Sequence, residues 1–295
     1  MNALRKYFEF VRFSHTVFAL PFALASMALA ARPNRGWPGW RTFLLVLAAM
    51  VCARTAAMGF NRIVDRKFDA QNPRTASRHL PTGKISLSGA WCLVLSASAG
   101  LVAASWFINR LCFALSPVAL AIVFFYSLTK RFTDLTHFFL GLSLAVAPVG
   151  AWLAVTGRFA WPPLVLAGAV VFWLVGFDII YATQDFEFDR KVGLRSLPAR
   201  LGIARSLQVA RWAHAAMAVV LVDFGWVAGL GWIFYAGLAV IVACLITQHA
   251  LARKQDPVSL NTAFFRMNAL ISLVFLAAVL ADVAFNPSPS GQSKF

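Results

Sequence analysis

Acidic and amide side chains recur at four-residue steps in two separate stretches of the chain. The first stretch holds Asn61, Asp65 and Asp69, directly after an apolar run that ends at Phe60. In a helix, four residues turn about 40° past one full turn, so these three side chains share a face about 80° wide. Carboxylate and amide oxygens suit Mg²⁺, which prefers a few protein oxygens together with substrate phosphates. The stretch therefore predicts either a magnesium and phosphate site or a solvated charged loop between two helices.

The second stretch repeats this spacing at Asp185 and Asp189. On a continued helix Asp178 falls within about 40° of both, whereas Glu187 points the opposite way. Asp178 also lies inside an apolar run, where an ionisable side chain is costly and indicates a functional site. Two clusters of matching spacing, each at the end of an apolar run, favour a binding site over solvated loops. The side chains predicted to hold Mg²⁺ are Asn61, Asp65, Asp69, Asp185 and Asp189.

The composition identifies an all-α membrane protein with several spans. The chain has 295 residues, of which 60% are hydrophobic and only 13% are charged. Soluble domains are about half apolar and about a quarter charged. The net charge of +16 could indicate nucleic-acid binding, but the basic residues lie in short loops between apolar runs, which is the pattern of membrane orientation. The four cysteines lie in apolar segments without paired spacing, so neither a disulfide nor a metal site is predicted from them.

Nine apolar runs approach the roughly 20 residues that a helix needs to cross a membrane. We expect nine transmembrane helices around a central cavity, in a single domain over residues 1–295. Prolines inside three of the runs, Pro21, Pro117 and Pro148, predict local kinks. The runs cover residues 14–31, 42–60, 86–108, 111–128, 135–156, 161–182, 206–224, 228–250 and 264–285.

The basic residues predict an orientation. Most of the 27 lysines and arginines fall in the N-terminal segment and in the second, fourth, sixth and eighth loops. Cytoplasmic loops carry such an excess, so we expect the N-terminus and both acidic clusters on the cytoplasmic side of a bacterial cytoplasmic membrane. Four spans separate the two clusters, and an even number returns the chain to the same side. The cavity is therefore expected to open toward the cytoplasm.

Both acidic patterns together resemble those of a known family, the UbiA superfamily of intramembrane prenyltransferases. The first pattern continues into Arg74-Thr75-x-x-Arg78, and the second reads Asp178-x-x-Tyr181-x-x-x-Asp185-x-x-x-Asp189. Tyr126-x-x-x-Lys130-Arg131 and the opening Arg12-Phe13-Ser14-His15-Thr16 are similar to the 4-hydroxybenzoate polyprenyltransferase branch. The resemblance covers essentially the whole chain. One position departs from it, because Arg62 stands where many members carry Asp.

The resemblance implies a Mg²⁺-dependent enzyme that transfers a polyprenyl group from polyprenyl diphosphate to a small aromatic acid, surrounded by membrane lipid. Mg²⁺ and basic side chains would neutralise the departing diphosphate. Asp178 and Tyr181 would serve the acceptor as catalytic residues, although a structural Asp178 paired with a buried partner such as Arg54 is an equal alternative. Arg12 would bind the acceptor's carboxylate or anchor the chain at the membrane surface. The substrate-binding residues implied are Arg12, Arg54, Arg62, Arg66, Arg74, Arg78, Tyr126, Lys130, Arg131 and Lys191.

Several functions stay open. The acceptor is either a 4-hydroxybenzoate-type acid of ubiquinone or menaquinone biosynthesis or, as Arg62 indicates through the resemblance, a 1,4-dihydroxynaphthoate-type acid of the futalosine menaquinone route. Prenylation of a tetrapyrrole fits the motifs less well. A cation-coupled secondary transporter would also carry acidic residues, but typically near the bilayer midplane on broken helices. Here the carboxylates lie at the ends of the spans among basic residues, which favours the handling of diphosphate. His137, His214 and His249 form no recognisable set of metal ligands.

Overall fold

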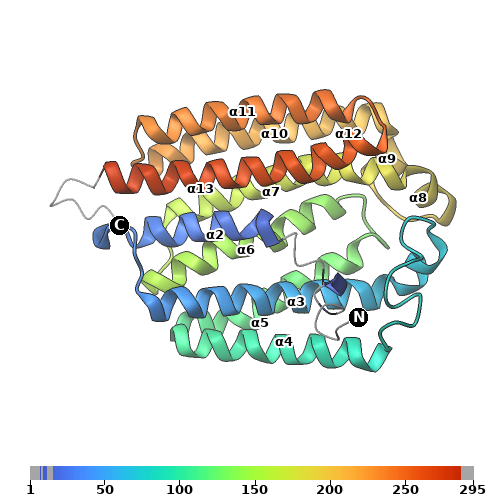
Figure 1. Ribbon diagram of the computed structural model, residues 1–295, viewed down its shortest axis with the longest axis horizontal. Coiled ribbons are helices and arrows are strands. Elements are labelled where there is room, and N and C mark those ends of the chain that lie inside the picture. The colour runs from blue at the N-terminus through green and yellow to red at the C-terminus, as the bar shows by residue number, and fades with distance from the viewer. Residues whose placement is uncertain (1–6, 8, 12–15, 287–295) are drawn as a thin grey trace.

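The computed structural model describes residues 7, 9–11 and 16–286, in which helices run side by side and are joined by short loops (Figure 1). The long helices are α2 (Thr16–Ala30), α3 (Trp40–Gln71), α4 (Leu87–Ile108), α5 (Arg110–Thr129), α6 (Thr136–Thr156), α7 (Trp161–Ala182), α10 (Ile203–Val227), α11 (Trp232–Ala252) and α13 (Asn268–Phe285). The short elements are η2 (Arg32–Asn34), η3 (Thr183–Asp185), α8 (Phe186–Val192), α9 (Leu197–Leu201), α12 (Pro257–Asn261) and the π-helix η4 (Thr262–Met267).

The predicted all-α membrane fold is confirmed. Among the described residues, eight helical segments are long and apolar enough to cross a membrane, and α2 is a shorter apolar helix. Each of the nine apolar runs corresponds to one of these helices. The prolines of three runs, Pro21, Pro117 and Pro148, lie inside α2, α5 and α6, which are assigned as helix throughout.

The two acidic clusters differ from each other in local structure, and only the second departs from the helix expected for it. α3 continues to Gln71, so the first cluster lies on a helix and the alternative of a solvated loop is wrong. The second cluster does not lie on one continued helix, because α7 ends at Ala182 and a 3₁₀ turn leads into α8. The hydroxyl of Thr183 donates a hydrogen bond to the carbonyl of Ile180 at 2.8 Å, a contact that commonly bends helices.

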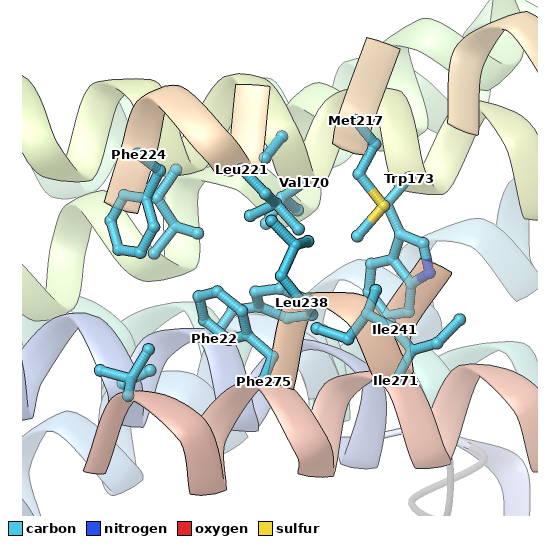
Figure 2. Close-up of a cluster of buried hydrophobic side chains, with 14 of the residues drawn as sticks. Phe22, Val170, Trp173, Met217, Leu221, Phe224, Leu238, Ile241, Ile271 and Phe275 are labelled. Atoms are coloured by element: carbon cyan, nitrogen blue, oxygen red, sulfur yellow. The ribbon is translucent and has the colours of Figure 1, made fainter. Parts of the chain in front are cut away.

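A dense apolar core joins α2, α7, α10, α11 and α13 (Figure 2). The ring of Phe22 stacks on that of Phe275 with a centroid separation of 4.6 Å and lies 4.9 Å from that of Trp173. The indole nitrogen of Trp173 donates a hydrogen bond to Asn268 at 3.0 Å, so this buried polar atom is satisfied. Rings packed in this way make the half of the molecule that includes α7 a firm support for the second cluster.

A small residue sets the contact between α6 and α7. A Cβ atom at Gly141 would lie only 2.9 Å from the carbonyl oxygen of Val171, closer than real Cβ atoms come. Helices in membranes approach most closely where small residues meet. Glycine at this position therefore lets the backbones of α6 and α7 come together.

α3, α4 and α5 form a second group of helices, with α3 packed against α4 and α5 against α6 (Figure 1). Interhelical loops then meet at both ends of the molecule. At one end the backbone amide of Arg195 donates to the carbonyl of Lys130 at 3.0 Å, and Arg200 pairs with Asp134 at 2.8 Å. At the other end Arg32 donates to the carbonyl of Gly229 at 3.0 Å. The loops that follow α3, α5 and α7 thus gather at one end, which brings the two acidic clusters together as expected.

Candidate active site

One cavity of about 720 Å³ lies among α3, α4, α5, α6 and α7. Its polar wall carries carboxylates from both acidic clusters together with Asp178. The rest of the wall is largely apolar and reaches Val46 on α3, Ile108 at the end of α4 and Leu153 on α6. Asn61 and Val46 are 15 residues apart on one helix, a rise of about 22 Å. The cavity therefore joins a charged end to a deep apolar channel.

The first cluster is held by cations from other segments. The side-chain amide of Asn61 donates to Asp65 at 3.0 Å, which confirms that these two residues share a helix face. Arg131 pairs with Asp65 at 3.1 Å, and Arg78 pairs with Asp69 at 2.6 Å. The second oxygen of Asp69 is buried and accepts no hydrogen bond among the described residues. This oxygen is an available acceptor in the charged end of the cavity.

Arg62, the residue at which the sequence differs from the family pattern, is buried beside the first cluster. Its guanidinium lies 3.9 Å from the second oxygen of Asp69, which is a charge contact beyond hydrogen-bond distance. Arg62 also lines the cavity. The structure therefore places this arginine in the cavity wall, and seven residues bring it to within about 20° of Asp69 on the helix.

The second cluster is held by the loop that follows α3. Asp185 accepts hydrogen bonds from the side chain of Asn72 at 3.0 Å and from Nε of Arg74 at 2.8 Å, and it also pairs with Nη2 of Arg74. Burial by itself would lower the pKa of Arg74, but the hydrogen bond to Asp185 raises it above its ordinary value. Asp189 is buried and accepts a hydrogen bond from Ser196 at 3.0 Å. The two clusters are thus joined through residues 72–74.

Lys130, at the C-terminal cap of α5, is the cation that both clusters share. Burial by itself would lower the pKa of Lys130, but the carboxylates of Asp189, Asp65, Asp178 and Asp185 together raise it. Lys130 therefore carries its positive charge among four carboxylates. An anion that enters the cavity would meet this charge together with those of the surrounding arginines.

Asp178 pairs with His137 and not with Arg54, the partner suggested from the sequence. One carboxylate oxygen of Asp178 lies 2.6 Å from Nδ1 of His137 on α6. Arg54 lines the cavity with Tyr126, about 10 Å deeper along α3 than Asn61 because seven residues separate them. Arg54 is therefore a cation in the inner part of the cavity wall.

Tyr181 lines the cavity between Asp178 and the second cluster. Its hydroxyl group accepts a hydrogen bond from Arg74 at 3.0 Å. Its ring stacks on that of Phe264, with a centroid separation of 4.1 Å. Phe264 belongs to the π-helix η4, and π-helical turns frequently occur at functional sites. Phe264 could have been recognised as a site residue only from this π-helical turn. The apolar sequence of the segment does not reveal the turn.

Not every predicted residue reaches the cavity. Arg66, Arg131 and Lys191 are exposed and are not among the residues that line it, so their role in substrate binding stays a prediction. Arg66 is turned away from the first cluster, since it is rotated about 100° from Asp65. Glu187 is exposed as expected. Arg12 lies outside the described residues, so its prediction stays open.

Four neighbours of the clusters, of Asp178 and of Tyr181 were not predicted as site residues. They are Asn72, His137, Ser196 and Phe264. Asn72 and Ser196 follow the two clusters directly in the chain, and their polar side chains were the available signal. His137 stands alone in an apolar run, where periodicity could not show which helix it faces.

The chemistry of the donor set fits Mg²⁺ bound together with a phosphate ligand. Within the described part of the chain, no three His, Cys, Asp or Glu side chains are gathered closely enough to hold a metal ion by themselves. Mg²⁺, however, typically uses one or two carboxylates and completes its shell with substrate phosphates and water. The buried second oxygen of Asp69, which accepts no hydrogen bond among the described residues, and the amide oxygen of Asn61 are hard donors of the required kind. The carboxylates therefore suit a shared metal and phosphate site.

Comparisons with known proteins agree with this geometry. A model of the UbiA prenyltransferase family matches residues 19–281. A 4-hydroxybenzoate octaprenyltransferase of Methylobacillus flagellatus is 30% identical over 250 residues, which cover 84% of this chain and 83% of that protein. A second one, of Alcanivorax borkumensis, is 34% identical over 223 residues, which cover 75% of this chain and 76% of that protein.

Solved structures show the same fold. The apo structure of a UbiA homolog from Aeropyrum pernix K1 has a TM-score of 0.82 at 33% identity and covers 91% of this chain and 98% of that chain. A UbiA homolog from Archaeoglobus fulgidus bound to DMAPP and Mg²⁺ has a TM-score of 0.73 at 22% identity, over 95% of this chain and 99% of that chain. At the lower identity the likeness concerns the fold alone.

Proposed function

Because this chain belongs to the UbiA prenyltransferase family, we propose that it transfers a polyprenyl group from polyprenyl diphosphate to an aromatic acid of the 4-hydroxybenzoate type. The observation that carries this proposal is the single cavity in which two carboxylate clusters, several cations and a deep apolar wall meet. Relatives named 4-hydroxybenzoate octaprenyltransferases support the acceptor, and the Archaeoglobus homolog bound to DMAPP and Mg²⁺ supports the donor and the metal.

The charged end of the cavity binds the diphosphate in this proposal. Asn61, Asp65 and Asp69 would hold Mg²⁺ from α3, and Asp185 and Asp189 would hold it from the opposite side. When bound, Mg²⁺ would act as a Lewis acid and neutralise the charge of the diphosphate. The protein's own donors to the diphosphate oxygens are then those that line the cavity: Arg62, Arg74, Arg78 and Lys130.

These donors act when the allylic C–O bond breaks and its electron pair leaves with the diphosphate. Fixed cations aimed at the oxygens where charge develops stabilise that step without reorganisation. Arg131 contributes indirectly, since it holds Asp65. The apolar walls exclude water from the allylic cation and accommodate the first part of the isoprenoid tail.

The acceptor lies between Asp178 and Arg54 in this proposal, with its ring near Tyr181. The ring carbon beside the hydroxyl group forms the new C–C bond and then loses its proton, while Asp178 accepts the hydrogen bond of the acceptor's hydroxyl group or takes the proton of that group. Arg54 is a cation in the cavity wall and is suited to the acceptor's carboxylate. Tyr126 lines the same part of the cavity and completes this inner end.

A 1,4-dihydroxynaphthoate-type acid is the second candidate acceptor. The observation that favours it is Arg62, which is buried beside Asp69 where many members of the family carry Asp. The proposal for a transporter is weaker, because the carboxylates line a cavity at one end of the helices and are paired with cations.

One assay tests the proposal and separates these candidates. Purified protein is incubated with a polyprenyl diphosphate, Mg²⁺ and each acid in turn, and the products are analysed by mass spectrometry alongside released diphosphate. We expect a prenylated acid from one of them, no product after chelation of Mg²⁺, and recovery when Mg²⁺ is returned. Absence of product with both acids would contradict the proposal, and cation-driven uptake into vesicles without release of diphosphate would identify a transporter.

A further inference from the structure

A buried histidine stands directly behind the carboxylate that faces the acceptor end of the cavity. His137 lies in the first turn of α6, is 1% exposed and does not line the cavity. Its Nδ1 atom lies 2.6 Å from Oδ2 of Asp178. Asp178 itself lines the cavity, and its side chain is 20% exposed. The contact therefore joins an inaccessible imidazole to an accessible carboxylate.

The surroundings of His137 fix the direction of this hydrogen bond. Nε2 is buried and has no hydrogen-bond partner among the described residues. An ionised carboxylate only accepts hydrogen bonds, so the nitrogen that faces it carries the proton. A neutral ring has one donor and one acceptor nitrogen. We therefore assign the proton to Nδ1, so that His137 donates to Oδ2 of Asp178.

The two oxygens of Asp178 consequently differ. Oδ2 accepts from His137, and Oδ1 has no hydrogen-bond partner within the described part of the chain. Oδ1 is also absent from the buried atoms without partners, so it is accessible from the cavity. A carboxylate that served only to satisfy a buried histidine would not need its second oxygen in the cavity.

We propose that His137 is a positioning residue for the aromatic acceptor: it holds Asp178 through Oδ2 and thereby directs Oδ1 at the acceptor's hydroxyl group. This inference rests on the function proposed above. Asp178 lies on α7, about one turn before its end at Ala182, whereas Asp185 lies beyond that end in η3. His137 therefore acts on the acceptor through Asp178 and makes no hydrogen bond to either carboxylate cluster among the described residues.

Two variants of the full chain test the inference. His137→Leu removes the hydrogen-bond donor and places an apolar side chain in the buried position. His137→Asn places an amide N–H close to where Nδ1 stood. We expect His137→Leu to lower kcat/KM for the acceptor about 10- to 100-fold, as loss of an orienting partner commonly does. The KM for polyprenyl diphosphate and its Mg²⁺-dependent binding should be unchanged, and His137→Asn should restore most of the loss.

His214→Asn is the matched control. His214 is also buried, but it lies on α10 and pairs with His249 at 2.9 Å, away from the cavity lining. The control should lose thermal stability without any change in the acceptor's kcat/KM per folded protein. Such a result separates a general effect of losing a buried imidazole from an effect on the acceptor.

Four outcomes would overturn the inference. Unchanged acceptor kinetics in His137→Leu would mean that Asp178 needs no orienting partner. An equal loss for both substrates, or loss of folded protein in both His137 variants, would assign His137 a structural role. If the wild-type protein prenylates no aromatic acid, the proposed function fails and this inference fails with it. If the wild-type protein is active and the His137→Leu variant is equally active, only the proposed role of His137 is refuted.

Discussion

Single carboxylates at the mouth of the cavity are each matched to a cation. Arg131 pairs with Asp65, Arg78 pairs with Asp69 and Arg74 pairs with Asp185. The pairs hold the carboxylates in place from two loops, with Arg74 and Arg78 in the loop after α3 and Arg131 in the loop after α5. They also supply donors at the positions where a diphosphate would carry its charge. Residue types and partners at this scale therefore decide what the cavity can bind.

Loss of a cluster carboxylate should abolish turnover. We expect Asp65→Ala and Asp185→Ala to lower the rate of prenyl transfer by at least about 100-fold, because each removes a charged ligand from the proposed Mg²⁺ site. Glu187→Gln is the control, since Glu187 is exposed on the opposite side of α8. Transfer rates and thermal unfolding of all three variants are measured together. Damage from Glu187→Gln equal to that from Asp185→Ala would show that the helical-face argument is wrong.

Asp178→Asn tests the proposed base and keeps the size of the side chain. We expect a loss of prenyl transfer of about 100-fold or more, as for removal of a positioned general base. Mg²⁺-dependent binding of the polyprenyl diphosphate should stay close to that of the wild type. Loss of diphosphate binding would instead put Asp178 in the metal site, and loss of folded protein would favour a structural pair with His137.

At the scale of elements, the contact between α6 and α7 governs the pair of His137 and Asp178. His137 precedes Gly141 by about one helical turn, and Asp178 follows Val171 by about two. Because the carbonyl oxygen of Val171 lies so close to Gly141, the spacing between the two helices depends on the missing Cβ atom. The same contact that packs the helices therefore brings the histidine to the carboxylate.

Gly141→Ala should destabilise the protein and disturb this pair. A methyl group 2.9 Å from a backbone oxygen cannot be accommodated by moving a side chain, so α6 and α7 must separate. We expect a loss of about 1–3 kcal/mol of stability, as for other overpacked contacts.

Gly150→Ala on the same helix is the control for Gly141→Ala. A Cβ atom there meets nothing within 4 Å, so helix propensity alone predicts a neutral or slightly stabilising change. Thermal unfolding in detergent measures both variants. Equal midpoints for the two would show that the contact is looser than described.

At the scale of the whole molecule, both acidic clusters and the loops that hold them lie at one end of the helices. Loops after α3, α5 and α7 meet there through Arg74, Arg195 and Arg200. The opposite end is closed by Arg32, which donates to carbonyls of the loop between α10 and α11. The cavity thus has a polar end and an apolar end. The line between the two ends follows the long axes of the helices, which is the expected direction of the membrane normal.

The excess of basic loops predicts that the polar end faces the cytoplasm. Ser77→Cys in the exposed loop after α3 and Asn34→Cys at the opposite end test this orientation in a background without the four native cysteines. A thiol reagent that cannot cross membranes should label Asn34→Cys in intact cells and Ser77→Cys only in inverted vesicles. The reverse pattern would invert the proposed orientation.

Sequence alone determined the number of apolar helices and the shared faces of the clusters. Span length follows from membrane thickness, and the common face of Asn61 and Asp65 follows from the turn of a helix. The same arithmetic also turns Arg66 about 100° away from Asp65. An even number of spans between the clusters placed them at the same end. These features depend on local periodicity and on counting, which the order of residues contains.

Only the tertiary structure decided which distant residues touch. The pairs of His137 with Asp178, of Asn72 with Asp185 and of Phe264 with Tyr181 join segments that are far apart in the chain. Each pair depends on the rotation of one helix against another. That rotation is set by packing contacts such as Gly141 against Val171, and no periodicity within a single helix specifies it.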